Sequence, residues 1–317
     1  MRFKKILILG IGQNSLTKET WEKIDHLTEK KVLLPADSKD IQKHLPTTDC
    51  LLVSLGITVN KGMIDRALNL KYIGALSTGY GRIDDAYAAK KGITVCNIPS
   101  YSTEAVAEFA FTIILEHIRE VERGKNQARK GDYSEATFFN VYEIKNKVFG
   151  VIGLGQIGSR IAEIAHDGFE ADTRYWSIRR KESYERKGIK YQKVEALIKE
   201  SDFLSLNLAY NKETEHFLNS QRIKLIKPRA VVINLAPMEL VDINALERRL
   251  KVGDITFILD HSDELSPANA KRLSKYKNCI LYPPIAYTSK EATAAKQEIF
   301  VQNIENFLKG KPINRVN

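Results

Sequence analysis

The stretch from Val148 to Gly158 constrains the fold of this chain more than any other. An apolar run leads into Gly153-x-Gly155-x-x-Gly158, and a segment with an apolar face follows from Ile161. This order predicts a strand, a sharp glycine turn and a helix packed on the strand. The N–H groups at the start of such a helix bind anions, and the middle glycine lets a pyrophosphate approach the backbone. The stretch therefore predicts a dinucleotide site; the alternative is a turn without a ligand.

Strand-like and helix-like segments alternate with short connections along the rest of the chain. This alternation predicts parallel sheets covered by helices. At 317 residues the chain is long enough for about two domains. We expect an α/β protein with two Rossmann-like domains, each a doubly wound parallel sheet, joined by two long crossing helices. These helices are predicted from about Ser102 to Arg123 and from Glu291 to Leu308.

Composition narrows the class of protein. Hydrophobic residues make up 43% of the chain and charged residues 28%, which is ordinary for a soluble protein with a sizeable core. The net charge of +10 comes from basic residues that are spread out rather than clustered with aromatic residues, so we expect a solvated basic surface and no nucleic-acid partner. No apolar run approaches membrane-spanning length and no leader is recognised, so we expect no membrane partner and a cytoplasmic location.

The three cysteines lie far apart and form no metal-binding or redox pair. Two of them fall in strand-like apolar runs. We expect Cys50, Cys96 and Cys279 to be buried thiols in a reducing compartment, and we expect no metal site.

Six motifs extend the pattern beyond the glycine turn. They are Ser-Thr-Gly-Tyr-Gly-Arg-Ile-Asp (77–84), Asn-Ile-Pro-Ser-Tyr-Ser-Thr-Glu-Ala-Val-Ala-Glu-Phe (97–109), the glycine motif (150–158), Ser-Asp-Phe-Leu-Ser-Leu-Asn-Leu (201–208), Lys-Pro-x-Ala-Val-Val-Ile-Asn (227–234) and Gly-Lys-Pro-Ile-Asn-x-Val-Asn (310–317). Together they resemble the D-isomer-specific 2-hydroxyacid dehydrogenase family, and most closely its glycerate dehydrogenase and hydroxypyruvate reductase branch. The resemblance runs from about Asp49 to Asn317.

The resemblance implies a domain organisation. Residues 1–101 plus 289–317 would form a flavodoxin-like domain on the substrate side, and residues 102–288 would form the dinucleotide-binding Rossmann domain. It also implies a homodimer.

The resemblance and the glycine motif together predict the cofactor site. Asp260 matches the residue that in the family bonds the nicotinamide carboxamide. The full predicted set is Val106, Gly153, Gly155, Gln156, Ile157, Gly158, Ser177, Arg179, Arg180, Asn207, Leu208, Ala209, Leu235, Ala236 and Asp260.

The end of the strand that follows the glycine helix bears on the choice between NAD and NADP. An acidic residue there would bond the 2′-hydroxyl of NAD and repel a 2′-phosphate. This chain has Ser177 followed by Arg179 and Arg180, and guanidinium groups suit a phosphate. Asp172 precedes the predicted strand and should point away. We therefore favour NADPH over NAD; the alternative is that both arginines are surface charges.

The catalytic trio that the resemblance implies is largely replaced. In the family an arginine grips the substrate carboxylate, a histidine donates a proton and a glutamate orients the histidine. Here Pro237 stands in the arginine motif, Pro284 stands in the histidine motif, and Asp263 falls at the glutamate position. Proline carries neither a charge nor a transferable proton, and losing a general acid costs about 10²- to 10⁴-fold in rate. Reduction of an ordinary 2-keto acid by this trio is therefore not expected.

Several residues are candidates for a replacement proton donor. His261 falls beside Asp263, and Tyr101, Tyr80, Tyr282 and Tyr287 are further candidates, since histidine and tyrosine can act as general acids. Solvent is the remaining alternative. The simpler alternatives are that His261 faces elsewhere and that Tyr101 only lines the cleft. The predicted lining of the substrate cleft is Thr78, Gly79, Tyr80 and Tyr101.

These patterns leave two main hypotheses for function. The first is an NADP(H)-dependent oxidoreductase that reduces something other than a simple 2-keto acid, such as an imine, an activated alkene or a carrier-bound carbonyl. The second is a catalytically inactive dinucleotide-binding protein, a sensor or assembly partner. Asp260 favours the first, whereas Pro237 and Pro284 favour loss of the ancestral activity.

Overall fold

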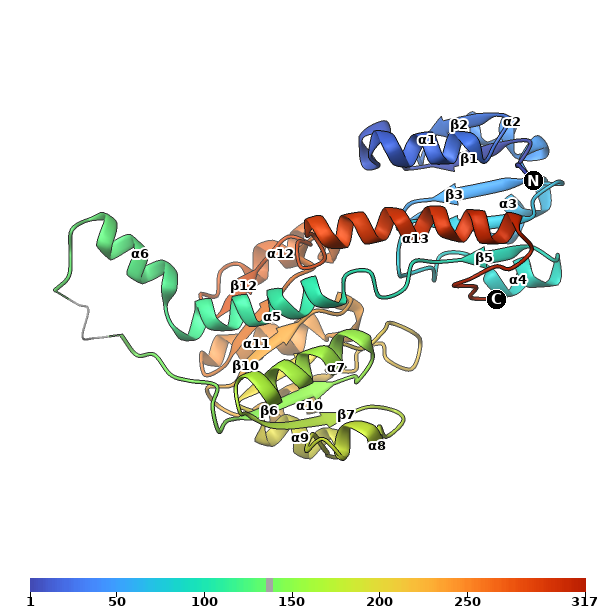
Figure 1. Cartoon of the computed structure of the whole chain (residues 1–317). Helices are drawn as coiled ribbons and strands as arrows, with labels where there is room; N and C mark the ends of the chain where they lie inside the picture. The colour runs from blue at the N-terminus through green and yellow to red at the C-terminus, as the bar shows by residue number, and fades with distance from the viewer. Residues whose placement is uncertain (135–138) are drawn as a thin grey trace. The chain divides into compact units, whose positions relative to one another are not determined.

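The chain forms two compact units (Figure 1). The structure is a computed structural model, and it describes residues 1–134 and 139–317. Unit 1 contains Met1–Ser102 and Ser289–Asn317, and unit 2 contains Thr103–Thr288. Each unit is built on a parallel sheet flanked by helices, so the predicted α/β class is confirmed.

Unit 1 has a five-stranded parallel sheet in the order β2-β1-β3-β4-β5, the doubly wound order of flavodoxin-like folds. Its strands are β1 (Ile6–Leu9), β2 (Lys31–Leu34), β3 (Cys50–Val53), β4 (Tyr72–Ala75) and β5 (Thr94–Cys96). Its helices are α1 (Lys18–His26), α2 (Ile41–His44), α3 (Lys61–Arg66), α4 (Asp85–Lys90) and α13 (Lys290–Leu308). Strands β1, β3, β4 and β5 are buried throughout, which is why they read as short apolar runs.

Unit 2 has a seven-stranded parallel sheet in the order β12-β11-β10-β9-β6-β7-β8. Its strands are β6 (Val148–Ile152), β7 (Asp172–Trp176), β8 (Lys190–Tyr191), β9 (Phe203–Leu206), β10 (Val231–Asn234), β11 (Thr256–Leu259) and β12 (Cys279–Leu281). Its helices are α5 (Thr103–Ile118), α6 (Val121–Arg129), α7 (Gln156–Glu163), α8 (Glu182–Glu185), α9 (Val194–Glu200), α10 (Ser220–Leu225), α11 (Ile243–Val252) and α12 (Pro267–Leu273). The strand order reverses between β6 and β9, the place where dinucleotide-binding sheets hold their ligand.

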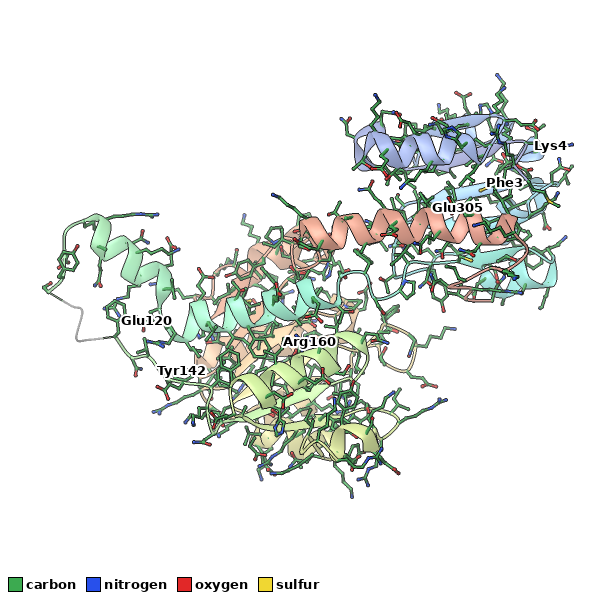
Figure 2. The ribbon with its side chains drawn as sticks, in the orientation of Figure 1. Phe3, Lys4, Glu120, Tyr142, Arg160 and Glu305 are labelled. Carbon is green, nitrogen blue, oxygen red and sulfur yellow. The ribbon has the colours of Figure 1, made fainter. Side chains whose placement is uncertain are left out.

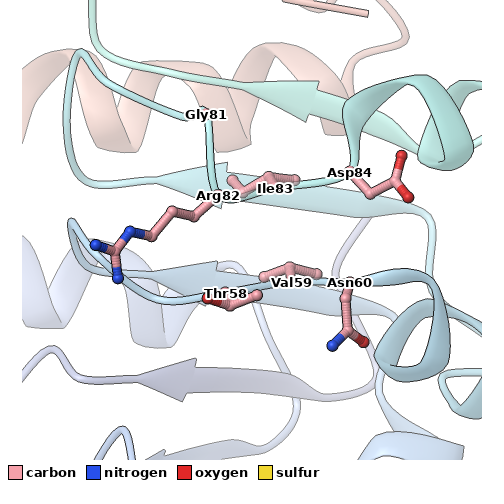
Figure 3. Close-up of a pocket in the computed structure, with 7 residues that line it drawn as sticks. All are labelled: Thr58, Val59, Asn60, Gly81, Arg82, Ile83 and Asp84. Atoms are coloured by element: carbon pink, nitrogen blue, oxygen red, sulfur yellow. The ribbon is translucent and has the colours of Figure 1, made fainter. Parts of the chain in front are cut away.

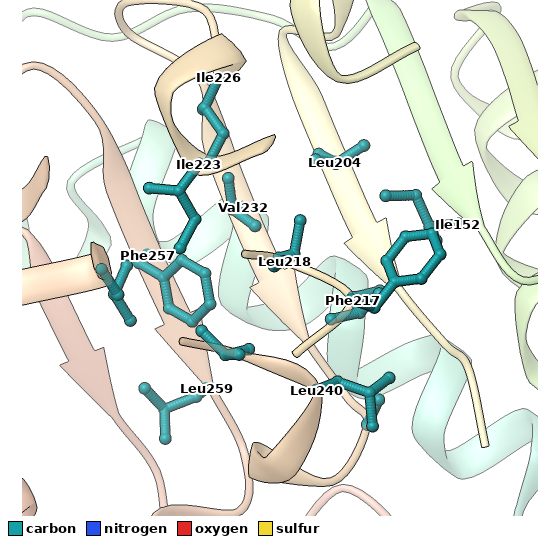
Figure 4. Packing of buried hydrophobic residues seen from close by; sticks show 14 of the residues in the cluster. Ile152, Leu204, Phe217, Leu218, Ile223, Ile226, Val232, Leu240, Phe257 and Leu259 are labelled. Carbon is teal, nitrogen blue, oxygen red and sulfur yellow. The ribbon is translucent and has the colours of Figure 1, made fainter. Parts of the chain in front are cut away.

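The core of unit 2 lies on both faces of this sheet. Successive residues of a strand point to opposite faces, so Val232 joins the hydrophobic cluster on one face while Val231 and Ile233 join the cluster on the other. Figure 4 shows the first cluster, in which Val232 packs beside Leu204 and Phe257. The three cysteines are buried and free, as predicted.

The helix predicted from Ser102 to Arg123 is in fact two helices. Helix α5 ends at Ile118, where its buried apolar stripe stops, and α6 begins at Val121. Between them Glu120 has a φ of +49°, and its carboxylate accepts a hydrogen bond from the guanidinium of Arg123 at 2.6 Å (Figure 2). No residue of α6 is buried. The prediction was wrong here because the polar residues after Ile118 still favour helix locally but have no core to pack against. No helix within residues 1–134 and 139–317 is long and apolar enough to span a bilayer.

A chain of buried amides joins α13 to the loop that follows β5. Asn303, 1% exposed, donates from Nδ2 to the carbonyl oxygen of Asn97 at 2.8 Å, and its Oδ1 accepts from Asn314 Nδ2 at 2.9 Å. Asn317 Oδ1 accepts the N–H of Val95 at 3.0 Å. The C-terminal tail therefore helps to position the loop of residues 97–102, where part of the substrate cleft is predicted.

Asn303→Ala should destabilise the protein. It leaves the buried carbonyl of Asn97 without its donor, an effect that typically costs about 1–3 kcal/mol. Gln302→Ala is the matched control, because the Gln302 side chain is exposed and bonds only Glu298 on the same helix; it should change stability by less than about 0.5 kcal/mol. Urea denaturation of both variants measures the difference, and equal losses would contradict the role given to Asn303.

Candidate active site

The predicted cofactor residues gather at one edge of unit 2. Gly153 follows β6, Ser177 follows β7, Asn207 follows β9, Leu235 follows β10 and Asp260 follows β11. The carboxyl ends of parallel strands meet at the same edge of a sheet, so these positions lie along one line. Gln156, Ile157, Leu208, Ala209 and Ala236 flank them, while Val106 is a buried residue of α5.

The three glycines of the turn have different roles in the structure. Gly153 has a φ of +92°, and a Cβ there would lie 2.9 Å from the carbonyl oxygen of Asn207. A Cβ on Gly158 would collide with the carbonyl oxygen of Gly153. A Cβ on Gly155, by contrast, would meet no protein atom within 4 Å. Packing therefore requires Gly153 and Gly158, whereas the open surface at Gly155, beside the unsatisfied first amides of α7, fits the close approach of a pyrophosphate.

The structure separates the two arginines after β7. Arg180 donates to the carboxylate of Glu185, with Nε 3.1 Å from Oε1, and lies over the ring of Tyr191 at 4.9 Å. Arg180 is thus engaged within the protein, and its role as a second phosphate ligand stays a prediction. The side chain of Arg179 is exposed and makes no hydrogen bond or ion pair within the described parts of the chain. Ser177 Oγ donates to the carbonyl oxygen of Arg179 at 2.5 Å, which shapes this turn.

Asp260 holds the segment that carries Pro284. It is 1% exposed, and its Oδ1 accepts the N–H groups of Ile285 and Ala286, each at 3.1 Å. Burial raises the pKa of Asp260, while these two hydrogen bonds and the neighbouring His261 oppose that rise. The Asp260 carboxylate therefore connects the end of β11 to the segment that follows β12.

Two further hydrogen bonds position the turn that carries Pro237. Asn234, completely buried, accepts the N–H of Ala236 at 3.2 Å. Glu264 Oε2 accepts the N–H of Met238 at 2.9 Å. Burial raises the pKa of Glu264 as well, and the hydrogen bond from Met238 opposes it. Both proline-bearing segments are thus held in place by carboxylates from the end of β11.

His261 lies among three carboxylates. Its Nε2 is 3.6 Å from Asp260 Oδ2, and its Nδ1 is 3.8 Å from Asp263 Oδ1 and 3.9 Å from Glu264 Oε1. The structure therefore brings the predicted pair His261 and Asp263 together. It adds Glu264, which sequence reasoning missed, since nothing in the sequence distinguishes it from Asp263. The Asp263 side chain is 56% exposed against 33% for Glu264, so Glu264 is the more enclosed acid.

The edge formed by the ends of β10, β11 and β12 is acidic. Residues 234–240, 260–264 and 282–286 include four carboxylates and one histidine, but no lysine or arginine. Such an edge stabilises positive charge on a bound molecule and disfavours negative charge.

The predicted cleft residues Thr78, Gly79, Tyr80 and Tyr101 belong to unit 1. Thr78 Oγ1 donates to the carbonyl oxygen of Ile98 at 2.8 Å, so the loops after β4 and β5 are joined. Ser77 Oγ donates to the carbonyl oxygen of Gly79 at 2.7 Å, and Tyr80 is half-buried. Tyr101, a candidate proton donor, belongs to unit 1 with these residues, whereas His261 belongs to unit 2.

A pocket of about 360 Å³ lies next to these loops, between residues 58–60 and 81–84 (Figure 3). Its polar side chains already have partners. Asn60 and Asp84 cap α3 and α4 by accepting the N–H groups of Met63 and Tyr87, and Arg82 donates to the carbonyl oxygen of Gly56. The pocket is therefore explained by helix capping.

Comparison with known proteins identifies the family. Residues 111–286 match the family model described as "D-isomer specific 2-hydroxyacid dehydrogenase, NAD binding domain". The chain is 36% identical to the glyoxylate reductase of Thermococcus litoralis over 85% of this chain and 83% of that protein. This chain belongs to the D-isomer specific 2-hydroxyacid dehydrogenase family. Unit 2 is accordingly an NAD(P)-binding domain, and the family's members are oxidoreductases.

Two solved structures match almost the whole chain. One is an acyclic imino acid reductase (Bsp5) in complex with NADPH and D-Arg, which is 30% identical with a TM-score of 0.85 and covers 98% of this chain and 100% of that one. The other is the D-lactate dehydrogenase of Aquifex aeolicus with NAD and lactic acid, which is 27% identical with a TM-score of 0.84 and covers 96% of both chains.

Gly155→Ala and Gly158→Ala should separate cofactor binding from folding. Gly155→Ala should leave the melting temperature unchanged and weaken dinucleotide binding at least about tenfold, a loss of about 1.4 kcal/mol, because the new methyl occupies the approach of the pyrophosphate. Gly158→Ala should destabilise the protein by about 1–3 kcal/mol through overpacking. Thermal unfolding and fluorescence titration with NADPH measure the two effects. Unchanged binding by Gly155→Ala would contradict this assignment of the turn.

Proposed function

We propose that this protein is an NADPH-dependent reductase of the C=N bond of acyclic imino acids. The observation that carries the proposal is the pair Pro237 and Pro284, which stand where the family resemblance places an arginine and a histidine. Both prolines lie on segments held by carboxylates, the buried Asp260 and the partly exposed Glu264. The edge is ordered, but it presents acids where a keto-acid reductase needs a cation and a proton donor.

The chemistry of imine reduction fits such an edge. A ketone becomes an alkoxide as hydride reaches its carbon, so its reduction needs a positioned general acid. A protonated imine already carries its proton on nitrogen, and it becomes a neutral amine without receiving another. The dinucleotide, when bound, supplies the hydride for either reaction. The carboxylates of Asp263 and Glu264 would stabilise the cationic imine before transfer, and no imidazole is required at position 284.

The acyclic imino acid reductase supports this proposal because its similarity extends over nearly the whole chain. The glyoxylate reductases among the curated relatives favour a second candidate, reduction of glyoxylate. In that case His261 would donate the proton, and its approach to Asp260, Asp263 and Glu264 within 4 Å is the supporting observation. Membership of the glycerate dehydrogenase and hydroxypyruvate reductase branch stays a prediction.

NADPH is proposed as the cofactor because of the end of β7. Ser177 and the exposed Arg179 offer a hydroxyl and a guanidinium to a 2′-phosphate. Asp172 is the first residue of β7, at the opposite end of the strand, and its carboxylate accepts from Arg174 at 3.0 Å and from Lys190 at 2.9 Å. It cannot take the place of the acid that selects NAD. Related structures bind NADPH in one case and NAD in another.

Substrate preference tests the proposed reaction. Oxidation of NADPH should be at least about 100-fold faster with pyruvate plus methylamine than with pyruvate or glyoxylate alone, because only the imine brings its own proton. Mass spectrometry should detect N-methylalanine as the product.

Rapid reduction of glyoxylate without amine would refute the imine proposal. His261→Gln would then show whether the second candidate is correct, since it should abolish that activity. NADPH binding with no turnover on either class would instead identify a dinucleotide-binding protein without catalytic activity.

Arg179→Gln should weaken NADPH binding by about 10- to 100-fold, the range expected for one charge-assisted hydrogen bond, and leave NADH binding within about twofold. Arg180→Gln is the matched control: Arg180 is engaged with Glu185, so its loss should affect NADPH less than the loss of Arg179. Fluorescence titration with both nucleotides measures the selectivity. Equal weakening of NADPH and NADH by Arg179→Gln would exclude a 2′-phosphate contact.

A further inference from the structure

Two consecutive prolines, Pro283 and Pro284, follow β12 at the active edge of unit 2. Proline has no backbone N–H, so this segment cannot donate the hydrogen bonds that usually fix the end of a strand. It is held from its two sides instead. On one side, the N–H groups of the two residues that follow the prolines bond Asp260. On the other side the segment is held by Tyr282.

The backbone of Tyr282 joins this segment to the loop that carries His261. The N–H of Tyr282 donates to the carbonyl oxygen of Leu259 at 2.8 Å, and its own carbonyl oxygen accepts the N–H of Ser262 at 3.2 Å. Ser262 follows His261 directly in the chain. A displacement of Tyr282 would therefore move the His261 loop together with the two prolines.

The side chain of Tyr282 reaches helix α5, which belongs to the same unit. Its hydroxyl donates to Glu116 Oε2 at 2.6 Å, and its ring meets the ring of Phe109 edge-on, with the two centroids 5.5 Å apart. A hydrogen bond from a hydroxyl to a carboxylate is stronger than one between neutral groups. Burial and the bond to Glu116 raise the pKa of Tyr282, so this candidate proton donor is a poor general acid.

We propose that Tyr282 is a positioning residue, whose hydrogen bond to Glu116 fixes the Pro284 segment and the His261 loop at the active edge. This inference rests on the proposed function, in which the imine binds at that edge. Helix α5 also carries Val106, a residue of the predicted cofactor site, so the bond fixes the substrate edge relative to the cofactor. A misplacement of about 1 Å between reacting groups can cost about 100-fold in rate. Tyr282 therefore acts on the reaction through the segments that it holds.

A double-mutant cycle tests the role of the pair. Tyr282→Phe keeps the ring and removes the hydroxyl. It should lower kcat/KM for pyruvate at saturating methylamine by about 10- to 100-fold, with a raised KM, and leave NADPH affinity within about twofold. Glu116→Ala should have the same effect, and the double variant should be no worse than either single variant, because both changes break one bond.

Two further variants serve as controls. Glu116→Gln keeps a hydrogen-bond acceptor and should retain most of the activity. Tyr276→Phe is the matched control for loss of a tyrosine hydroxyl: Tyr276 precedes β12, at the opposite end of the strand, and its hydroxyl lies 3.5 Å from Glu247 Oε1. It should leave kcat/KM within about twofold, since no segment of the active edge depends on it.

Hydrogen exchange measures the positioning without any turnover. Tyr282→Phe should speed exchange at the amides of Ser262, Ile285 and Ala286 at least about tenfold, and Tyr276→Phe should not. Unchanged exchange rates in Tyr282→Phe would overturn the proposal, and so would additive effects of the two substitutions in the cycle. Absence of imine reduction by the wild-type protein, together with faster exchange in Tyr282→Phe, would refute the proposed function and leave the positioning role standing.

Discussion

The close approach of Gly158 to the carbonyl of Gly153 is the contact on which the active edge of unit 2 depends. It brings the start of α7 so close to the end of β6 that a side chain at position 158 would collide with the backbone. The same turn bonds its neighbours, since the N–H of Gly153 donates to the carbonyl of Trp176 and the N–H of Asn207 donates to that of Ile152. The ends of β6, β7 and β9 are thereby held in one register. The first amides of α7 consequently point along the edge where a pyrophosphate can bind.

The other half of that edge is organised by two carboxylates, one buried and one partly exposed. Asp260 and Glu264 use their carboxylates to hold the backbone of the segments that carry Pro284 and Pro237. Proline suits these positions structurally, because each segment is fixed through the N–H groups of the residues that follow it. Burial raises the pKa of both carboxyl groups, and the hydrogen bonds from those amides and the neighbouring His261 oppose that rise. The same groups therefore provide the order of the site and its negative potential.

The sequence predicts the features that depend on local pattern and misses those that depend on neighbours. The glycine turn and the strand ends were predictable, because the spacing of the glycines indicates the turn and the apolar runs indicate the strands. Strand β2 was missed, because its apolar run is only Val32–Leu34 and this edge strand is only half-buried. The engagement of Arg180 by Glu185 and the hydrogen bond from Met238 to Glu264 are tertiary facts. No spacing rule distinguishes Arg179 from Arg180 or Asp263 from Glu264 before the chain is folded.

Under the proposed assignments, the charge at the edge of unit 2 favours a cationic substrate. An α-imino acid presents a cationic nitrogen to this acidic edge. A 2-keto acid has only the carboxylate, and hydride addition would create a second negative charge at its oxygen. Like charges about 4 Å apart repel by about 4 kcal/mol at an effective dielectric constant of about 20, which would slow alkoxide formation by roughly 10³-fold. The negative electrostatic potential at the edge of unit 2 then favours reduction of a C=N bond over a C=O bond. This discrimination does not require a dedicated general acid.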